Sequence, residues 1–572
     1  MYFTLAVSAA SREACVALTA AALDADPRVM PIRGPAQVAW RSADERQAVV
    51  RWGGGDAAWC GGDAAWRGGI EGRGPSAPAV AAASRAGTIW AEAAAVRART
   101  ALARVDPVYL AEVPGAVVIC DRASWAAAVT GRLGEHDPVT IAAFLSLGYP
   151  VGAATPFRRV RALGPARELR AADGRLVVTR VPGAVRAEES AGAGGRSGAA
   201  ELVAAALVDA VRPLNGAQVE LSLTGGKDSR LIAAALTAAG VPFRARTHGA
   251  ADHPDVVVAA MIAGKLGVEH VVTEPRPPGH HDKAELIGRL RATVLVSDGM
   301  LSAFENVGRP DPEATAEPVQ TGGHGGELLR GGYAQAAWRS RSPVGSWRPA
   351  ASAWSAAAGA ELFRRMTTRR LSLLHRGAAV AYLTSLAPNA AALRRGPLRA
   401  LDDFYLENRA GRWSAAARQG YLLRSPLVQP LFSDRVVQAA RAVPLRERMT
   451  DWLPRQVLAV LGPELLDIPL AGGGWKDASP SQAAGLPRRA SQPDWRRDSG
   501  EEMARLLREY TLDLGATGGL FEVVRREAAE QVLRSPRADP HAAWALATLA
   551  ALVSGDWLNA RSPGSIMAGW TT

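Results

Sequence analysis

The segment that most constrains the fold is residues 221–230, Leu-Ser-Leu-Thr-Gly-Gly-Lys-Asp-Ser-Arg, which joins a short apolar strand to an alanine-rich helix at 231–239. The two glycines let the backbone approach an anion closely. The helix that follows directs its free N–H groups and the positive end of its dipole to the same place. Thr224 and Ser229 add hydroxyl donors, and Asp228 can hold a magnesium ion. The segment therefore predicts a cradle for the pyrophosphate end of a nucleotide.

This glycine turn (residues 223–229) differs from the phosphate loop of kinase-type proteins, because the spacing G-x-x-x-x-G-K-[ST] is absent. Its order, Ser/Thr-Gly-Gly-x-Asp-Ser, instead resembles the PP-loop of ATP pyrophosphatases, which split ATP into AMP and pyrophosphate. The resemblance implies ATP and Mg²⁺ as cofactors.

Length and composition favour a globular protein of two or more domains. At 572 residues the chain is too long for one ordinary core, and its 48% hydrophobic content is not that of a disordered protein. It has no apolar run of the roughly 18 residues that a membrane span needs, and residues 1–5 lack the basic region of a signal peptide. We therefore expect no membrane partner. Three cysteines, Cys15, Cys60 and Cys120, are too few for a disulfide scaffold and fit the reducing cytoplasm.

The chain is basic, with a formal net charge of +12 and an isoelectric point near 10.2. A basic protein can bind nucleic acid. Only four of the 67 basic residues are lysines, however, and the arginines are scattered, which is typical of a GC-rich genome. A nucleic-acid partner is therefore not expected, whereas an acidic peptide or a nucleotide fits the charge.

The apolar runs divide the chain into two domains. Residues 1–185 contain short runs bounded by Gly, Pro and Asp, at 48–52, 116–120 and 176–180, and these predict a mostly β domain. Residues 186–200, rich in Gly, Ala and Ser, are predicted to be a linker.

The second domain, residues 201–572, alternates helices and strands before it becomes mainly helical after about residue 350. The predicted elements are a helix at 202–211, a strand at 219–223, the glycine turn and its helix, a strand at 243–247 and a helix at 254–266. Alternation of this kind implies a parallel sheet covered on both faces. Ligands of such sheets bind beyond the carboxyl ends of the strands, where the glycine turn lies.

Residues 248–255 follow the second of these strands. A backbone-rich loop beside the glycine turn can recognise adenine through main-chain hydrogen bonds. Asp255 lies at the start of the next helix, where a carboxylate satisfies free N–H groups, and is predicted to cap it.

A third segment, residues 321–333, has six glycines in thirteen residues, so its backbone can pass close to a ligand. Glu327 is a candidate second magnesium ligand opposite Asp228. His324 titrates near neutrality and is a candidate base for an attacking amine.

Lys476 lies in residues 472–477, Gly-Gly-Gly-Trp-Lys-Asp, and is the only lysine in the last half of the chain. A cation there can stabilise the charge that builds up as an acyl-adenylate collapses. A surface lysine on a loop is an equally good interpretation of this position.

In this order, and behind a β-rich domain, these segments resemble the asparagine synthetase family. Its signatures are Ser-Gly-Gly-Leu-Asp-Ser, then Gly-Leu-Pro-Gly-Ser-Pro-Asp before a helix that ends in Leu-Gly and His, then Ser-Gly-Glu-Gly-x-Asp-Glu-Leu-x-Gly-Gly-Tyr. The second corresponds to residues 249–255, and its helix ends in Leu-Gly-Val-Glu-His at 266–270. The family's Arg-x-Pro-Phe-Leu-Asp has only a loose counterpart within residues 424–434. The resemblance covers most of the chain. It implies an α/β fold, with an N-terminal β-rich glutaminase-like domain and a C-terminal parallel-sheet PP-loop synthetase domain with a helical tail.

Two departures from the family carry information. The family's glutaminase uses a cysteine that becomes N-terminal when Met1 is removed, but position 2 here is Tyr2, and Cys15 lies too far along the chain. The first domain is therefore expected to be degenerate and to release no ammonia from glutamine. In the third segment, His324 replaces the family's first glutamate and Glu327 its aspartate. Related amide-forming enzymes, such as β-lactam synthetases, also vary the first of these positions, and the attacking amine then belongs to the substrate.

A chain of this family without the glutaminase cysteine resembles most the lasso-peptide macrolactam cyclases. The resemblance implies an ATP-dependent carbon–nitrogen ligase that adenylates a side-chain carboxylate of a precursor peptide and closes an isopeptide ring with the peptide's N-terminal amine, releasing pyrophosphate and AMP. It also implies a leader peptidase and a small leader-binding protein as partners. Asp228 and Glu327 would bind magnesium, His324 would be the base and Lys476 the stabilising cation. The implied ATP site comprises Leu223, Thr224, Gly225, Gly226, Asp228, Ser229, His248, Gly322 and Gly323.

Other functions stay open. One is an amide ligase for a small molecule, of the asparagine or β-lactam synthetase type, and another is a non-catalytic or nucleotide-sensing relative. A third is a tRNA-modifying PP-loop protein, since sulfur-inserting tRNA enzymes also carry Lys at the variable position, here Lys227. Those enzymes need cysteines to carry sulfur, and none lies beyond residue 120.

Overall fold

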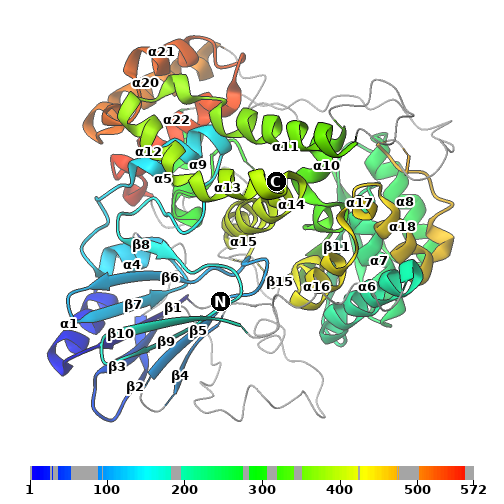
Figure 1. Ribbon diagram of the computed structural model, residues 1–572, viewed down its shortest axis with the longest axis horizontal. Helices are drawn as coiled ribbons and strands as arrows, with labels where there is room; N and C mark the ends of the chain where they lie inside the picture. The colour runs from blue at the N-terminus through cyan, green and yellow to red at the C-terminus, as the bar shows by residue number, and fades with distance from the viewer. Residues whose placement is uncertain are drawn as a thin grey trace.

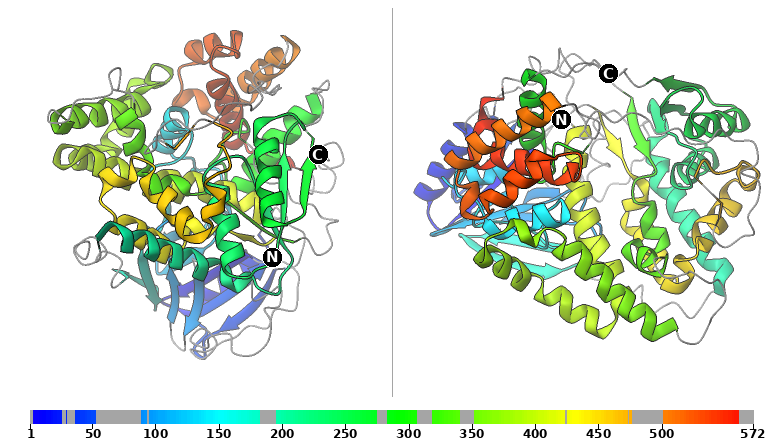
Figure 2. Two further views of the ribbon diagram at one scale, coloured as in Figure 1. Left: turned by 90° about the vertical axis from the view of Figure 1, so that its right-hand side faces the viewer. Right: turned by 90° about the horizontal axis from the view of Figure 1, so that it is seen from above.

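The computed structural model describes residues 3–25, 29, 36–52, 88–92, 95–181, 195–274, 283–305, 318–339, 351–422, 425–472, 474–475 and 501–560. The N-terminal strands lie on one side of the molecule and the parallel-sheet region on the other, with α14 (Pro397–Phe404) and α15 (Ala415–Leu422) between them (Figure 1, Figure 2). Within these residues, no helix combines the length and the apolarity needed to cross a membrane.

The short apolar runs predicted a mostly β region, and the structure shows that its strands form two antiparallel sheets. One has the strand order β2-β3-β1-β7-β6-β8 and the other β10-β9-β5-β4. The runs at 48–52, 116–120 and 176–180 are found in β3 (Gln47–Trp52), β7 (Ala116–Cys120) and β10 (Arg175–Arg180). The other strands are β1 (Phe3–Ala9), β2 (Ala36–Arg41), β4 (Thr88–Glu92), β5 (Ala95–Arg99), β6 (Tyr109–Val113), β8 (Val160–Ala162) and β9 (Arg167–Ala172).

The alternation of side chains along β1 accounts for the burial of the six-stranded sheet on both faces. Ala6 packs with Val49 and Ile119 between the two sheets. Leu5 and Val7 point to the opposite face, where α1 (Arg12–Leu23) and α4 (Ala123–Val129) cover the sheet.

The second half of the chain contains the predicted parallel sheet, with the order β13-β12-β11-β14-β15 and parallel pairing throughout. Its strands are β11 (Val219–Ser222), β12 (Arg244–His248), β13 (His270–Thr273), β14 (Val319–Gly322) and β15 (Leu427–Val428). The first two correspond to the strands predicted at 219–223 and 243–247. The predicted helix at 254–266 is α8 (Pro254–Leu266).

Five helices share a hydrophobic core with this sheet: α6 (Gly195–Val211), α7 (Asp228–Ala238), α8, α16 (Asp434–Ala442) and α18 (Trp452–Leu461). Helix α6 begins at Gly195, so residues 195–200 of the segment predicted to be a linker are helical. The rest of that segment, residues 186–194, lies outside the described residues.

The described residues after 350 are mainly helical, as predicted. The remaining helices within the described residues are α5 (Pro138–Leu147), α9 (Lys283–Ser297), α10 (Gly332–Arg339), α11 (Ala351–Thr368), α12 (Arg376–Ser385), α13 (Ala387–Arg395), the π-helix η6 (Tyr405–Ser414), α17 (Leu445–Arg448), α20 (Glu501–Thr517), α21 (Arg526–Arg534) and α22 (Pro540–Val553). Short 3-10 turns lie at Arg212–Leu214, Gly326–Arg330, Leu371–Leu373, Pro430–Phe432, Pro463–Leu465, Leu520–Glu522 and Asp556–Asn559.

The helices of the N-terminal region share one core with the C-terminal helices. Trp125 of α4 and Leu145 of α5 belong to the same buried cluster as Leu290 of α9 and Trp544 of α22. Residue 185, the boundary predicted from the sequence, therefore does not separate two independent hydrophobic cores.

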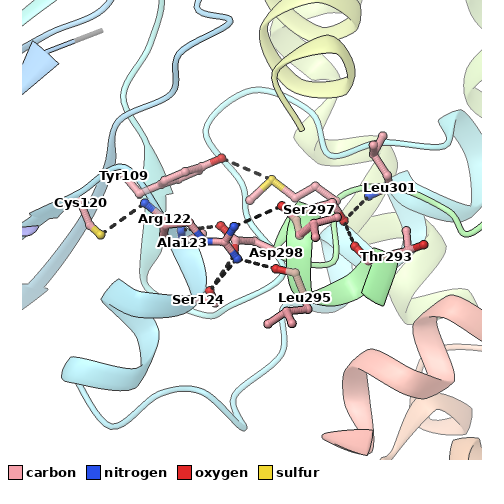
Figure 3. Close-up of polar contacts among 12 residues, drawn as sticks. Tyr109, Cys120, Arg122, Ala123, Ser124, Thr293, Leu295, Ser297, Asp298 and Leu301 are labelled. Atoms are coloured by element: carbon pink, nitrogen blue, oxygen red, sulfur yellow. Dashed lines mark hydrogen bonds and ion pairs between the residues drawn. The ribbon is translucent and has the colours of Figure 1, made fainter. Parts of the chain in front are cut away.

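A buried polar cluster reinforces this junction (Figure 3). Arg122 follows β7 and donates to the carbonyl oxygens of Leu295 (2.5 Å) and Val296 (3.2 Å) at the end of α9. It also forms an ion pair with Asp298, whose other oxygen accepts a hydrogen bond from Ala123 N–H at 2.8 Å. Breaking such a buried pair leaves an uncompensated charge, so the cluster fixes how the two regions meet.

Candidate functional site

Three parallel strands end side by side at one edge of the second sheet. Ser222 of β11 lies opposite Gly322 of β14 and opposite Arg246 of β12. Leu223, the first residue of the glycine turn, is buried and donates from its N–H to Arg246 O at 2.9 Å, while its carbonyl accepts from Thr247 Oγ1 at 2.8 Å. The glycine turn and the third segment therefore leave the sheet from adjacent strands.

The glycine turn is closed by its own side chains. Ser229 Oγ accepts a hydrogen bond from Thr224 N–H and lies at the same distance, 3.1 Å, from Thr224 Oγ1. Thr224 Oγ1 in turn accepts from Gly226 N–H at 3.2 Å. These contacts stand directly before α7, whose first N–H groups have no partner within the helix. This edge of the sheet can therefore present donors and a helix dipole to an anion.

The structure corrects the prediction for Asp255. Helix α8 is capped by His253, whose Nδ1 accepts a hydrogen bond from Asp255 N–H at 3.2 Å. The Asp255 carboxylate instead accepts from Gly225 N–H at 3.1 Å. Gly225 has no room for a side chain, because a Cβ there would lie 2.5 Å from Ala471 Cβ. Asp255 thus fixes the glycine turn rather than its own helix.

Arg230, on the first turn of α7, anchors the chain that leads toward Lys476. Its guanidinium donates to the carbonyl oxygens of Leu465 (2.8 Å), Ile468 (2.7 Å) and Pro469 (2.7 Å). Two residues further on, the backbone N–H of residue 471 donates to the carbonyl of residue 225 at 3.1 Å. The 465–471 segment is therefore held against the glycine turn.

Lys227, at the variable position of the turn, has an acidic partner. Its ammonium group forms an ion pair with Asp451, which is fully buried and also accepts from Gln335 Nε2 at 3.2 Å. The Trp475 ring centroid lies 5.2 Å from Lys227 Nζ. Lys476, the next residue along the chain, lies outside the described residues, so its role stays a prediction.

The third segment passes so close to α7 that side chains cannot fit at two of its positions. A Cβ on Gly323 would lie 2.4 Å from Ser229 N, and one on Gly326 would lie 2.0 Å from Asp228 Cγ. The glycines predicted close backbone approach to a ligand. At these two positions the close approach is to the start of α7, which brings the third segment against the glycine turn.

Asp228, the first residue of α7, has two carboxylate oxygens in different environments. Oδ2 accepts a hydrogen bond from Arg330 Nη2 at 2.6 Å, whereas Oδ1 is buried and has no hydrogen-bond partner among the described residues. Burial raises the pKa of Asp228 to about 6, against the opposing effect of Arg330 and with a further contribution from Glu327. Asp228 and Glu327 are thus electrostatic neighbours.

The donor set around Asp228 fits Mg²⁺ bound together with a nucleotide. Mg²⁺ commonly takes one or two carboxylates, with phosphate oxygens and waters completing its octahedral shell. Asp228 Oδ1 is a buried carboxylate oxygen without a partner in the described part of the chain. Those residues contain no group of three or more His, Cys, Asp or Glu side chains arranged to hold a metal. The site therefore fits an ion that arrives with phosphates better than one held by the protein alone.

Glu327 and His324 are both exposed. Glu327 Oε2 accepts a hydrogen bond from Tyr405 OH at 3.0 Å. The His324 ring centroid lies 6.4 Å from that of Tyr421. Protein atoms around the exposed His324 ring desolvate it in part, and this lowers its pKa. Glu327 acts to raise the pKa, and Arg418 acts to lower it. An imidazole with a lowered pKa is neutral at pH 7 and can accept a proton.

The residues implied to bind ATP lie together at this edge of the sheet. His248 ends β12, opposite Thr273 of β13, and is exposed. The others lie at the ends of β11 and β14 or at the start of α7: Leu223, Thr224, Gly225, Gly226, Asp228, Ser229, Gly322 and Gly323.

Three residues that contact this site received no role from the sequence: Arg330, Tyr405 and Asp451. Arg330 was recognisable, because it is the one cation within the glycine-rich third segment. Tyr405 lies 78 residues from its partner Glu327, and Asp451 lies 224 residues from Lys227. No local pattern links partners so far apart, so only the fold identifies them.

We found no match to this chain among protein-family models or among curated proteins. The likeness to the asparagine synthetase family therefore depends on the motifs and their order, and the function that it implies is a proposal.

Proposed function

We propose that the protein is an ATP-dependent amide ligase that activates a carboxylate as an acyl-adenylate and passes the acyl group to an amine. One observation carries this proposal: the third segment, with Glu327 and His324, packs against the glycine turn and the start of α7 through Gly323 and Gly326. Such a reaction needs three features close together: a phosphate-binding turn, two neighbouring acids and a base.

The proposed reaction has two steps. In the first, a substrate carboxylate oxygen bonds to the α-phosphorus of ATP, the bond between the α-phosphorus and the bridging oxygen breaks, and pyrophosphate leaves. In the second, the amine nitrogen bonds to the acyl carbon, and the bond from that carbon to the AMP oxygen breaks. The amine proton passes to a base, and AMP leaves.

The residues divide these tasks by their chemistry. The glycine turn and the N-terminus of α7 bind the phosphates, and Asp228 and Glu327 would hold Mg²⁺. The ion, when bound, neutralises phosphate charge. His324 accepts the amine proton, and Lys476 stabilises the negative charge that develops as the adenylate collapses.

The nitrogen is proposed to come from the substrate itself, as the resemblance to the macrolactam cyclases implies. The ligase reaction that the resemblance favours is macrolactam formation in a lasso peptide. In it, the N-terminal amine of a peptide attacks the adenylated Asp or Glu side chain of the same peptide. A test of macrolactam formation therefore includes a leader peptidase and a leader-binding protein in the reaction mixture.

The decisive experiment uses a substrate carboxylate labelled with ¹⁸O. The full-length protein is incubated with ATP, Mg²⁺ and a peptide that begins with Gly and carries a labelled acid several residues later, with aspartate plus ammonia as the comparison. Adenylation predicts AMP and pyrophosphate in equal amounts and one ¹⁸O atom in AMP. A peptide product lighter by one water supports ring closure. Release of ADP and phosphate instead would overturn the proposal.

The base assignment has its own test. His324→Ala is expected to slow amide formation by about a hundredfold or more. Because a base acts in its deprotonated form, ionisation of both Asp228 and His324 should contribute to the rise of the wild-type rate with pH, and the contribution of His324, whose pKa is lowered, should be missing in the variant. His375→Ala, at an exposed histidine that contacts Phe521 O, is the matched control. An unchanged pH profile in His324→Ala would remove the base assignment.

A further inference from the structure

The ten-residue π-helix η6 contacts the third segment at its first residue. Tyr405 OH donates to Glu327 Oε2 at 3.0 Å. The Tyr405 ring also packs directly on the backbone of Gly332, where a Cβ would lie 2.6 Å from Tyr405 Cγ. Continuous π-helix is rare and occurs frequently at functional sites. Here it places a phenol on a candidate magnesium ligand.

The next turns of η6 form hydrogen bonds with the N-terminal region of the chain. Asn408 Oδ1 accepts a hydrogen bond from Gly152 N–H at 2.8 Å, and Arg412 donates to the same loop at the carbonyl of residue 154. Arg104 bridges the two sides, since its Nη2 donates to Gly152 O (3.2 Å) and to Glu407 O (3.0 Å). One helix thus contacts both the N-terminal domain and Glu327.

A second connection runs beside the first. Tyr149, just after α5, has its hydroxyl 2.7 Å from that of Tyr333, the last residue of the third segment. The Tyr333 ring meets the Tyr405 ring edge-on, with centroids 5.2 Å apart and an interplanar angle of 79°. The two connections therefore converge on Tyr405.

The contacts are buried, which gives them the rigidity that positioning requires. Arg104 and Asn408 are each 1% exposed, and Tyr149 is 2% exposed. A buried polar group that loses its partner costs free energy, so breaking one of these hydrogen bonds is unfavourable and the contacts restrict how the two regions can move.

We propose that the N-terminal domain positions Glu327 for magnesium, with Arg104, Asn408 and Tyr149 acting through Tyr405 as positioning residues. The inference rests on the proposed function, because it takes Glu327 as a ligand of the ion. It gives the N-terminal region a task in the reaction: the region supports a carboxylate of the synthetase site.

The test measures metal binding separately from turnover. Mn²⁺ replaces Mg²⁺ and is titrated into the full-length protein by electron paramagnetic resonance, with α,β-methylene-ATP as a nucleotide that cannot be cleaved between its α- and β-phosphates. Tyr405→Phe and Tyr149→Phe are expected to weaken Mn²⁺ binding in the same direction, Tyr405→Phe by about tenfold, the effect typical of losing an outer-shell partner of a metal ligand. In turnover, the Mg²⁺ concentration for half-maximal rate should rise while the rate at saturating Mg²⁺ changes little.

The matched control is Ser124→Ala. Its hydroxyl also crosses the junction, where it donates to Asp298 Oδ1 at 2.6 Å, and among the described residues it makes no hydrogen bond with η6 or the third segment (Figure 3). Thermal unfolding confirms that each variant folds. Wild-type Mn²⁺ affinity in Tyr405→Phe, or equal losses in Ser124→Ala and Tyr149→Phe, would overturn the positioning role. A wild-type protein that binds Mn²⁺ with the nucleotide but forms no AMP contradicts the proposed ligase alone, whereas one that binds no Mn²⁺ contradicts both.

Discussion

Two aspartates, Asp228 and Asp402, are both shielded from solvent and paired with arginine, yet their surroundings act in opposite directions. The Asp402 side chain is 1% exposed, and both of its oxygens accept from Arg448, at 3.2 and 2.6 Å. Burial acts to raise its pKa, but Arg448 and Arg441 hold the pKa below its usual value. The Asp228 side chain is 22% exposed and accepts from Arg330 through one oxygen only. Burial prevails there, and the pKa rises to about 6.

The difference separates an ion pair that supports the fold from a carboxylate that is available to a ligand. At Asp402 both carboxylate oxygens accept hydrogen bonds from Arg448, so the protein itself satisfies the charge of this carboxylate. At Asp228, one buried oxygen lacks a partner among the described residues. A carboxylate held in this state is costly unless a cation reaches it, and strongly perturbed groups of this kind concentrate at functional sites.

The largest expected effect is the loss of stability when the complete pair is broken. Asp402→Asn leaves the buried Arg448 without its counter-charge and should lower the free energy of unfolding by about 3 to 5 kcal/mol. Urea unfolding at pH 7 measures this. Asp403→Asn is the matched control, because its side chain is 43% exposed and its partner Arg441 keeps a second counter-charge in Asp402. It should cost less than about 1 kcal/mol. Equal losses in the two variants would contradict the distinction.

At Asp228 the same substitution should have the opposite sign. The folded-state pKa lies above the usual 3.8, so the folded protein loses stability relative to the unfolded chain as pH rises from about 4 to about 6. Asp228→Asn removes this cost and should stabilise the protein at pH 8 by up to about 3 kcal/mol, at about 1.4 kcal/mol per unit of pKa shift.

Thermal unfolding at pH 8 and pH 4.5 checks both the sign and the pH dependence of this effect. The gain should be large at pH 8 and small at pH 4.5, where the wild-type carboxyl is already protonated. A destabilised Asp228→Asn at pH 8 would place Asp228 in the same class as Asp402.

Sequence patterns predicted the secondary structure around Asp228, because it depends on neighbouring residues in the chain. The strand, turn and helix around Asp228 follow from a short apolar run, two glycines and an alanine-rich segment, and α8 was predicted at its observed bounds. The β character of the N-terminal region followed in the same way from runs bounded by turn residues, whereas the antiparallel pairing of its strands was not predicted.

What the sequence could not provide is the partner of each side chain. Asp255 has the spacing of a helix cap, yet it accepts from Gly225, because the fold brings α8 beside the glycine turn. Nothing near Asp402 in the chain distinguishes it from Asp228, since its partner Arg448 lies 46 residues away. The continuous core between the N-terminal and C-terminal helices likewise depends on tertiary packing, which no local pattern encodes.

The smallest expected effect tests Arg330, the stronger of the two cations, Arg330 and Lys227, that hold down the pKa of Asp228. Arg330→Gln removes that charge, so the pKa of Asp228 should rise above about 6. An opposite charge at this distance is worth about one pKa unit or more, which is about 1.4 kcal/mol. Because Mg²⁺ needs the ionised carboxylate, the pH at which pyrophosphate release reaches half its maximum should move upward by about one unit. Arg330→Lys keeps the charge and should leave this midpoint near the wild-type value. If Arg330→Gln and the wild-type protein have the same midpoint, a group other than Asp228 controls how the rate of pyrophosphate release falls at low pH. The difference between Asp228 and Asp402 would then affect stability but not turnover.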